Sequence, residues 1–90
     1  MRMPFVAGNW KMNTTVAEAE KLVREMLVPL NDINGVGKVL CPPFISLSVV
    51  KNILQGSGIK VGAQNMYFET KGAYTGEISP VMLSELCEFV

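Results

Sequence analysis

The sequence predicts an α/β fold with parallel strands. Short apolar runs begin near residues 5, 38, 59 and 89, and segments of helical character separate them. This alternation favours parallel strands, because each helix carries the chain back to the same edge of the sheet by a right-handed crossover. We therefore expect three βα units and the start of strand four, within either a doubly wound sheet or a closed barrel. Composition alone does not choose between them.

The first unit of the predicted fold pairs a strand with an amphipathic helix. Residues 5–9 form an apolar run with a polar end, as expected of a strand that opens into a loop. Thr15 is suited to cap the helix, because the Glu18 carboxylate three residues later can reach back to the cap amide. Pro29 disfavours helical geometry at Val28, so we expect the helix to end near there. One face of this helix carries the apolar residues Val16, Ala19, Leu22, Val23, Met26, Leu27 and Leu30.

The second unit is shorter. We expect a strand over residues 38–41, closed by two prolines that cannot donate hydrogen bonds to a central ladder. A helix is expected over residues 46–54, ended by the glycines at 56 and 58.

The third unit contains the longest predicted loop. A strand is expected over residues 59–63, and a polar, glycine-containing stretch over residues 65–78 follows it. Ser79 is suited to cap a short helix that begins at Pro80 and reaches Cys87. Helices on one side of three strands would leave the other face of the sheet bare and two strand edges unpaired.

Composition excludes several classes of function. The chain carries eight basic and eight acidic residues, and this zero net charge argues against a nucleic-acid partner. It has no histidine, which excludes a serine triad or an ordinary zinc site within this chain, and Cys41 and Cys87 are too far apart for a metal ligand set. No apolar stretch is long enough for a signal sequence or membrane span, so we expect one cytoplasmic domain over residues 1–90 with no membrane partner.

The segment most suggestive of chemistry follows the first strand. Strand alternation places Phe5, Ala7 and Asn9 on one face, which makes Asn9 the polar end of an apolar row. Lys11 can direct its ammonium group to the same opening, where a compact charge suits a phosphorylated or enolate-like ligand. The alternative is that Asn9 caps a loop and Lys11 is merely solvated.

Four motifs resemble one enzyme family. They are residues 7–13 (AGNWKMN), 41–44 (CPPF), 61–65 (VGAQN) and 72–80 (GAYTGEISP), and in this order they resemble triosephosphate isomerase. The resemblance covers the whole chain but only about 0.36 of a barrel of roughly 250 residues. It implies an α/β fold that is the N-terminal part of a (β/α)8 TIM barrel.

The resemblance also implies residue roles. Asn9 and Lys11 match the substrate-binding residues of the first loop, and Lys11 is the catalytic residue that stabilises charge on the phosphate and the enediolate. Gln64 and Asn65 resemble a supporting second layer behind them. In the family the long loop inserts into a neighbouring subunit, which implies a homodimer through residues 65–78. The implied interface residues are Met12, Tyr74, Thr75, Gly76 and Glu77.

The implied activity is the interconversion of dihydroxyacetone phosphate and D-glyceraldehyde 3-phosphate in glycolysis and gluconeogenesis, without a metal or organic cofactor. The family also uses a neutral histidine electrophile and a glutamate base, and triosephosphate isomerase is the reference case for that pair. Neither group has a counterpart in this chain, so we expect the 90 residues alone to be inactive. Two alternatives remain: an assembly module that docks through residues 65–78, and a non-catalytic barrel fragment.

Overall fold

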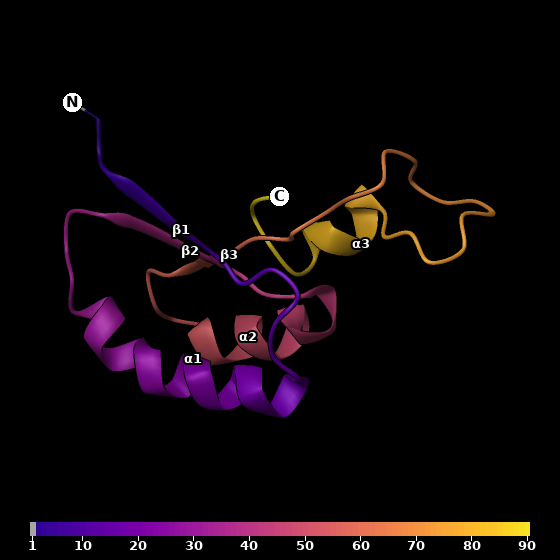
Figure 1. The fold of residues 1–90 in the computed structure, drawn as a ribbon. Coiled ribbons are helices and arrows are strands. Elements are labelled where there is room, and N and C mark those ends of the chain that lie inside the picture. The colour runs from indigo at the N-terminus through magenta and orange to yellow at the C-terminus, as the bar shows by residue number, and fades with distance from the viewer. Residues whose placement is uncertain (1) are drawn as a thin grey trace.

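The computed structural model describes residues 2–90, which form a parallel sheet with two helices against one face (Figure 1). The three strands are in the order β1-β2-β3, and both neighbouring pairs are parallel. The helices α1 and α2 lie on the same side of the sheet, as the alternation of strands and helices predicts. The elements are β1 (Phe5–Asn9), α1 (Val16–Asn31), β2 (Gly37–Cys41), the 3-10 helix η1 (Phe44–Ser46), α2 (Leu47–Leu54), β3 (Lys60–Val61) and α3 (Pro80–Ser84).

A fourth strand begins where the sequence predicts it. Gly62 and Phe89 form a parallel bridge, and the Ala63 amide donates to the Phe89 carbonyl at 2.8 Å. Glu88 donates from its amide to the Val61 carbonyl at 3.0 Å. Together with the three strands and the helices between them, this bridge confirms three βα units and the start of strand four.

The N-terminus of α1 has the predicted cap. The Glu18 amide donates to Thr15 Oγ1 at 3.2 Å, and the Thr15 amide donates to Glu18 Oε1 at 2.9 Å. Hydrogen bonding from Thr15 to the Glu18 carboxylate, first of all from the Thr15 backbone amide, lowers the pKa of this carboxyl below its ordinary value of 4.5, because it favours the ionised form. The loop after β1 therefore ends at a fixed point on the helix.

The predicted end of α1 near Val28 is wrong. The helix continues through Pro29 to Asn31, and the Asp32 amide still donates to the Val28 carbonyl at 3.1 Å. Proline lacks an N–H group and crowds the carbonyl four residues earlier, but the additional turn packs Leu30 against the core. Lys38 supplies a second reason, because its buried ammonium donates to the Leu30 carbonyl at 2.6 Å and so satisfies the open end of the helix.

Two other predicted boundaries are too long. The ladder of β3 covers only Lys60 and Val61 rather than residues 59–63, although the bridge at Gly62 extends it. Helix α3 ends at Ser84 rather than at Cys87. The last turn still closes with the Cys87 amide donating to the Leu83 carbonyl at 2.9 Å, so the chain curves into strand four.

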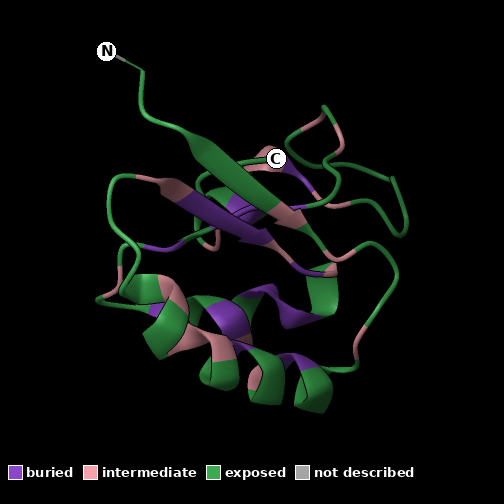
Figure 2. Cartoon of the chain, turned by 60° about the vertical axis from the view of Figure 1, so that its left-hand side comes forward, coloured by how far each residue is buried: buried purple, intermediate pink, exposed green. Residues whose placement is uncertain are grey.

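The core lies between the sheet and the helices (Figure 2). It is continuous across α1, β2, α2 and β3, and it leaves β1 largely exposed. The buried cluster consists of Ala19, Val23, Leu40, Leu47, Val50, Leu54, Ile59, Val61, Ala63 and Leu83. One face of the sheet is thus packed, while β1 remains an open edge, as expected from the sequence.

Candidate active-site loop

The carboxyl ends of the three strands are tied together by hydrogen bonds to one carbonyl. The Trp10 amide, just after β1, donates to the Cys41 carbonyl at the end of β2 at 3.2 Å. The Gln64 side chain, just after β3, donates from Nε2 to the same carbonyl at 2.9 Å. Because the strands are parallel, the segments that follow them meet at one edge of the sheet. The Asn9–Asn13 loop therefore begins at a braced position.

Gln64 also holds this loop directly. Its Nε2 donates a second hydrogen bond, of 2.8 Å, to the carbonyl of Lys11. The side-chain amide of Gln64, a residue that follows β3, thus links the loop after β1 to the end of β2. This contact joins Gln64 to the backbone of Lys11, and its supporting role for the loop residues stays a prediction. The Asn65 side chain makes no hydrogen bond within residues 2–90, so no hydrogen bond supports the role predicted for it.

The backbone of the loop is folded tightly around Lys11. Asn9 Oδ1 accepts a hydrogen bond from the Lys11 amide at 3.0 Å, and Asn13 Nδ2 donates to the Trp10 carbonyl at 2.7 Å. Lys11 has φ of 56° and Thr14 has φ of 78°, in the left-handed region that residues other than glycine rarely adopt. Such conformations cost roughly 1–3 kcal/mol each and persist where the surroundings hold them. The side-chain amides of Asn9 and Gln64 hold the conformation at Lys11.

The Lys11 side chain is available to a ligand. It is exposed, and no carboxylate within residues 2–90 forms a salt bridge with it. Asn9 lies on the same face of the sheet as Cys41, with which it is in register. The Cys41 thiol is unsuited to be a nucleophile, because burial raises its pKa and keeps it protonated. Binding chemistry at this edge is therefore that of an ammonium group and neutral amides.

The loop between β3 and α3 extends away from the sheet and the helices (Figure 1). Its base is closed by the Tyr67 amide, which donates to the Ile78 carbonyl at 2.8 Å, and the Tyr67 and Tyr74 rings pack with centroids 4.7 Å apart. Gly72 permits this packing, since a Cβ atom there would lie 2.7 Å from the Tyr74 ring. The projecting loop is therefore held in one conformation by its own contacts. Four of its residues are exposed: Tyr74, Thr75, Gly76 and Glu77.

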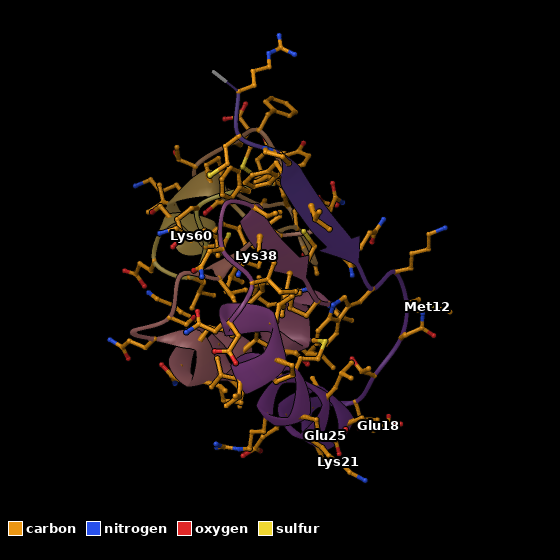
Figure 3. The ribbon with its side chains drawn as sticks, turned by 90° about the vertical axis from the view of Figure 1, so that its left-hand side faces the viewer. Met12, Glu18, Lys21, Glu25, Lys38 and Lys60 are labelled. Carbon is orange, nitrogen blue, oxygen red and sulfur yellow. The ribbon has the colours of Figure 1, made fainter. Side chains whose placement is uncertain are left out.

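Met12 is the most exposed large apolar residue of the first loop. Its side chain is 96% exposed and lies on the outer side of the loop that joins β1 to α1 (Figure 3). Met12 and the projecting loop belong to different parts of the chain, and each presents apolar or aromatic groups to solvent. Burial of both in an interface would remove this exposure.

Sequence reasoning missed two groups that shape the site. The Cys41 carbonyl collects hydrogen bonds from the segments after β1 and β3, but a backbone acceptor leaves no signal in the residue type. Lys38 fastens the end of α1 to β2, and Figure 3 shows it beside both elements. A lysine inside an otherwise apolar strand was the available signal.

Other kinds of site find no support in the described part of the chain. Residues 2–90 contain no cluster of three or more histidine, cysteine, aspartate or glutamate residues that could hold a metal ion. None of the helices described for these residues has the length and apolar character needed to cross a bilayer.

The parallel order of the strands, the helices on one face and the polar loops at the carboxyl edge define the N-terminal part of a TIM barrel. The family model for triosephosphate isomerase matches residues 4–89. The chain belongs to the triosephosphate isomerase family.

The curated relatives are much longer than this chain. A protein named triosephosphate isomerase from Dehalococcoides mccartyi strain CBDB1 is 59% identical over all 90 residues, which span 36% of its own length. One from Carboxydothermus hydrogenoformans is 55% identical over 86 residues, or 96% of this chain and 34% of the relative. The Clostridium tetani protein of the same name is 51% identical over 86 residues and 33% of its length. The chain thus spans about a third of each relative.

Proposed function

We propose that this chain forms the first part of a triose-phosphate isomerase, in which Asn9 and Lys11 bind the phosphorylated triose. The reaction interconverts dihydroxyacetone phosphate and D-glyceraldehyde 3-phosphate through an enediolate, without a cofactor. The supporting observation is the Lys11 loop, whose backbone is held in a left-handed conformation while its ammonium group stays exposed and without a carboxylate partner in residues 2–90. Family membership supports the proposed substrate class.

The proposed role of Lys11 follows from the charge of the reacting species. Abstraction of a proton next to a carbonyl leaves a negative charge on oxygen, and the substrate already carries a phosphate. A fixed positive charge stabilises both, and it is most effective when the protein positions it before the reaction begins. Asn9 would contribute its amide group beside Lys11, with its Oδ1 already committed to the Lys11 amide. Lys11 is therefore the proposed catalytic residue of this segment.

The proton transfers are assigned to other parts of a barrel. The histidine and the glutamate base implied by the resemblance have no counterpart among these 90 residues. Gln64 is proposed as the positioning residue behind Lys11, with Asn65 beside it in the chain. On this proposal the enzyme works in the cytoplasm.

We also propose a homodimer through residues 65–78 in the complete protein. The loop projects and is internally braced, and Thr75, Gly76 and Glu77 on it are exposed beside the packed Tyr74. Met12 is the proposed contact on the other subunit, since it is almost fully exposed on the loop that carries Lys11. The same projection favours the alternative function, an assembly module that docks through this loop without catalysis.

A chimera tests the enzyme proposal. Residues 1–90 replace the matching segment of the Dehalococcoides mccartyi relative, which is 59% identical over this length. We expect the chimera to catalyse the conversion of glyceraldehyde 3-phosphate in a coupled assay, and Lys11→Ala to lower its rate at least about a hundredfold. Lys21→Ala, on the exposed face of α1, is the matched control. A Lys11→Ala chimera within threefold of its parent would mean that Lys11 is only solvated.

The 90-residue chain assayed alone tests the proposed division of roles. We expect no turnover above the buffer rate, because the histidine and the base are missing. Turnover near the roughly 1 to 1,000 per second typical of enzymes would contradict the proposed division of roles. A correctly folded chimera without any activity would favour the assembly module.

A further inference from the structure

Asn13 holds the peptide group that joins Trp10 to Lys11. Its Nδ2 donates to the Trp10 carbonyl at 2.7 Å. At the other side of the same peptide plane, the Lys11 amide donates to Asn9 Oδ1 at 3.0 Å. Asparagine side chains bond nearby backbone groups readily, and here two of them engage the two polar groups of one peptide. The orientation of this peptide is therefore held from both sides.

The backbone groups next to this peptide are held as well. The Trp10 amide donates to the Cys41 carbonyl at 3.2 Å, and the Lys11 carbonyl accepts from Gln64 Nε2 at 2.8 Å. The Trp10 side chain packs against the core. Each backbone N–H and C=O group of Trp10 and Lys11 thus has a partner within residues 9–64, although Lys11 itself is exposed.

A flip of the Trp10–Lys11 peptide is the motion that Asn13 opposes. Rotation of one peptide plane by roughly 180° changes ψ of the residue before it and φ of the residue after it, and type I and type II turns differ in this way. Lys11 has φ of 56°, so a flip would carry it to the negative φ that residues with a side chain prefer. The flip would break the hydrogen bonds of Asn9 and Asn13 together. Without Asn13, the bond to Asn9 alone would have to prevent it.

The orientation of this peptide decides which end of the Asn9 side-chain amide is free. The Lys11 amide engages Oδ1 of Asn9, so Nδ2 remains available as a donor. After a flip, the Trp10 carbonyl would replace the Lys11 amide beside Asn9, and a carbonyl can accept only from Nδ2. The Asn9 amide would then turn and present its oxygen to a ligand. An oxyanion bound beside Lys11 needs the N–H donor in that place.

We propose that Asn13 is a positioning residue for Asn9. It fixes the Trp10–Lys11 peptide, so that Asn9 presents its N–H donor to an anionic ligand. The inference rests on the proposed function, in which Asn9 and Lys11 bind a phosphorylated triose. Asn13 acts through the backbone and is not itself a ligand contact.

The test replaces Asn13 in the chimera. Asn13→Leu keeps a side chain of similar size but removes the donor. The fraction of chains with a correctly oriented Asn9 then falls, and the apparent affinity for the substrate falls in proportion. We expect KM to rise at least about fivefold while kcat stays within about twofold of the parent. A loss of folded protein would instead lower the apparent kcat and leave KM unchanged.

Hydrogen exchange gives a readout that needs no turnover. The Lys11 amide is bonded to Asn9 Oδ1, and its exchange should accelerate at least about fivefold in Asn13→Leu. Asn52→Leu is the matched control, because Asn52 is exposed on α2 and its side chain makes no hydrogen bond within residues 2–90. The control should change neither KM nor the exchange of the Lys11 amide. If circular dichroism shows that Asn13→Leu does not fold, Asn13→Ala takes its place.

A double variant shows whether Asn13 acts through Asn9. In an Asn9→Ala background, Asn13→Leu should change KM less than about twofold, because the group that it orients is gone. An effect of full size in that background would overturn the proposal, and so would KM and exchange at the level of the control. A rise in KM that disappears at high protein concentration would overturn it as well, since Asn13 would then act at a subunit contact.

The proposed function can fail separately from the role of Asn13. A Lys11→Ala chimera within about threefold of its parent refutes the enzyme proposal. In that case, faster exchange of the Lys11 amide in Asn13→Leu still supports the hold of Asn13 on the peptide, and unchanged exchange overturns it.

Discussion

Replacing Gln64 by methionine tests whether the support of Lys11 matters for catalysis. Methionine has a similar length but no donor, so Gln64→Met removes the hydrogen bonds of 2.8 Å to the Lys11 carbonyl and 2.9 Å to the Cys41 carbonyl. Lys11 has φ of 56°, and a left-handed conformation costs a residue with a side chain roughly 1–2 kcal/mol. In this variant Asn9 Oδ1 is the side-chain acceptor that still holds the Lys11 backbone, and we expect that hydrogen bond alone to be too weak to keep the loop in this conformation most of the time.

The size of the effect follows from that energy. A penalty of about 1–2 kcal/mol lowers the fraction of chains with a correctly placed Lys11, and therefore kcat/KM, by about 5- to 30-fold. The assay is the coupled isomerase reaction of the chimera. Gln55→Met is the matched control, because Gln55 is also exposed but its side chain makes no hydrogen bond within residues 2–90. We expect the control to stay within twofold of the parent.

A double variant distinguishes positioning from a general loss of structure. If Gln64 acts only through Lys11, then Gln64→Met should lower the rate of the Lys11→Ala chimera less than twofold, since the group it positions is gone. The reasoning is refuted if Gln64→Met alone matches the control, or if its effect is undiminished in the Lys11→Ala background.

Three further predictions concern the interface, the core and the helix cap. In the complete protein, Thr75→Arg should dissociate the dimer, because a buried charge without a counter-ion costs several kcal/mol, and an unchanged dimer on sedimentation would contradict this. Leu47→Ala should destabilise the 90-residue chain by about 2–5 kcal/mol in urea unfolding, since Leu47 is fully buried; a loss below about 1 kcal/mol would mean that this core is loosely packed. Thr15→Ala should cost about 1 kcal/mol at pH 7. The capping contribution of Glu18, whose folded pKa is lowered, is present above pH 4.5 and is lost as the pH falls through that folded pKa, so Glu18→Gln should flatten this part of the stability profile.

Much of the local structure could be predicted because it depends on neighbouring residues. The cap at Thr15 needs only Glu18 three positions away, and the predicted hydrogen bonds are both present. The end of α1 was mispredicted because it depends on Lys38, which lies in the next strand and bonds the carbonyl of Leu30. Lengths of β3 and α3 likewise depend on the bridge between Gly62 and Phe89, a contact between segments far apart in sequence.

The candidate site likewise has features that neighbouring residues predict and features that depend on distant segments. The sequence placed Asn9 at the polar end of the first strand, because side chains alternate between the two faces of a strand. It also indicated Lys11 as a candidate ligand-binding residue, because Lys11 follows the carboxyl end of that strand. The site roles of these residues remain predictions. The conformation of the loop was beyond the sequence, because it is set by the carbonyl of Cys41 and by the amide of Gln64, which is 53 residues from Lys11.

The sequence by itself determined the order of strands and helices, their parallel direction and the family, since periodicity, caps and short motifs are local properties of the chain. Only the tertiary structure decided that the ends of three strands share one backbone acceptor and that Lys38 closes α1. The physical reason is that hydrogen bonds between distant segments depend on where the chain lies in space. Residue types specify them only through the fold.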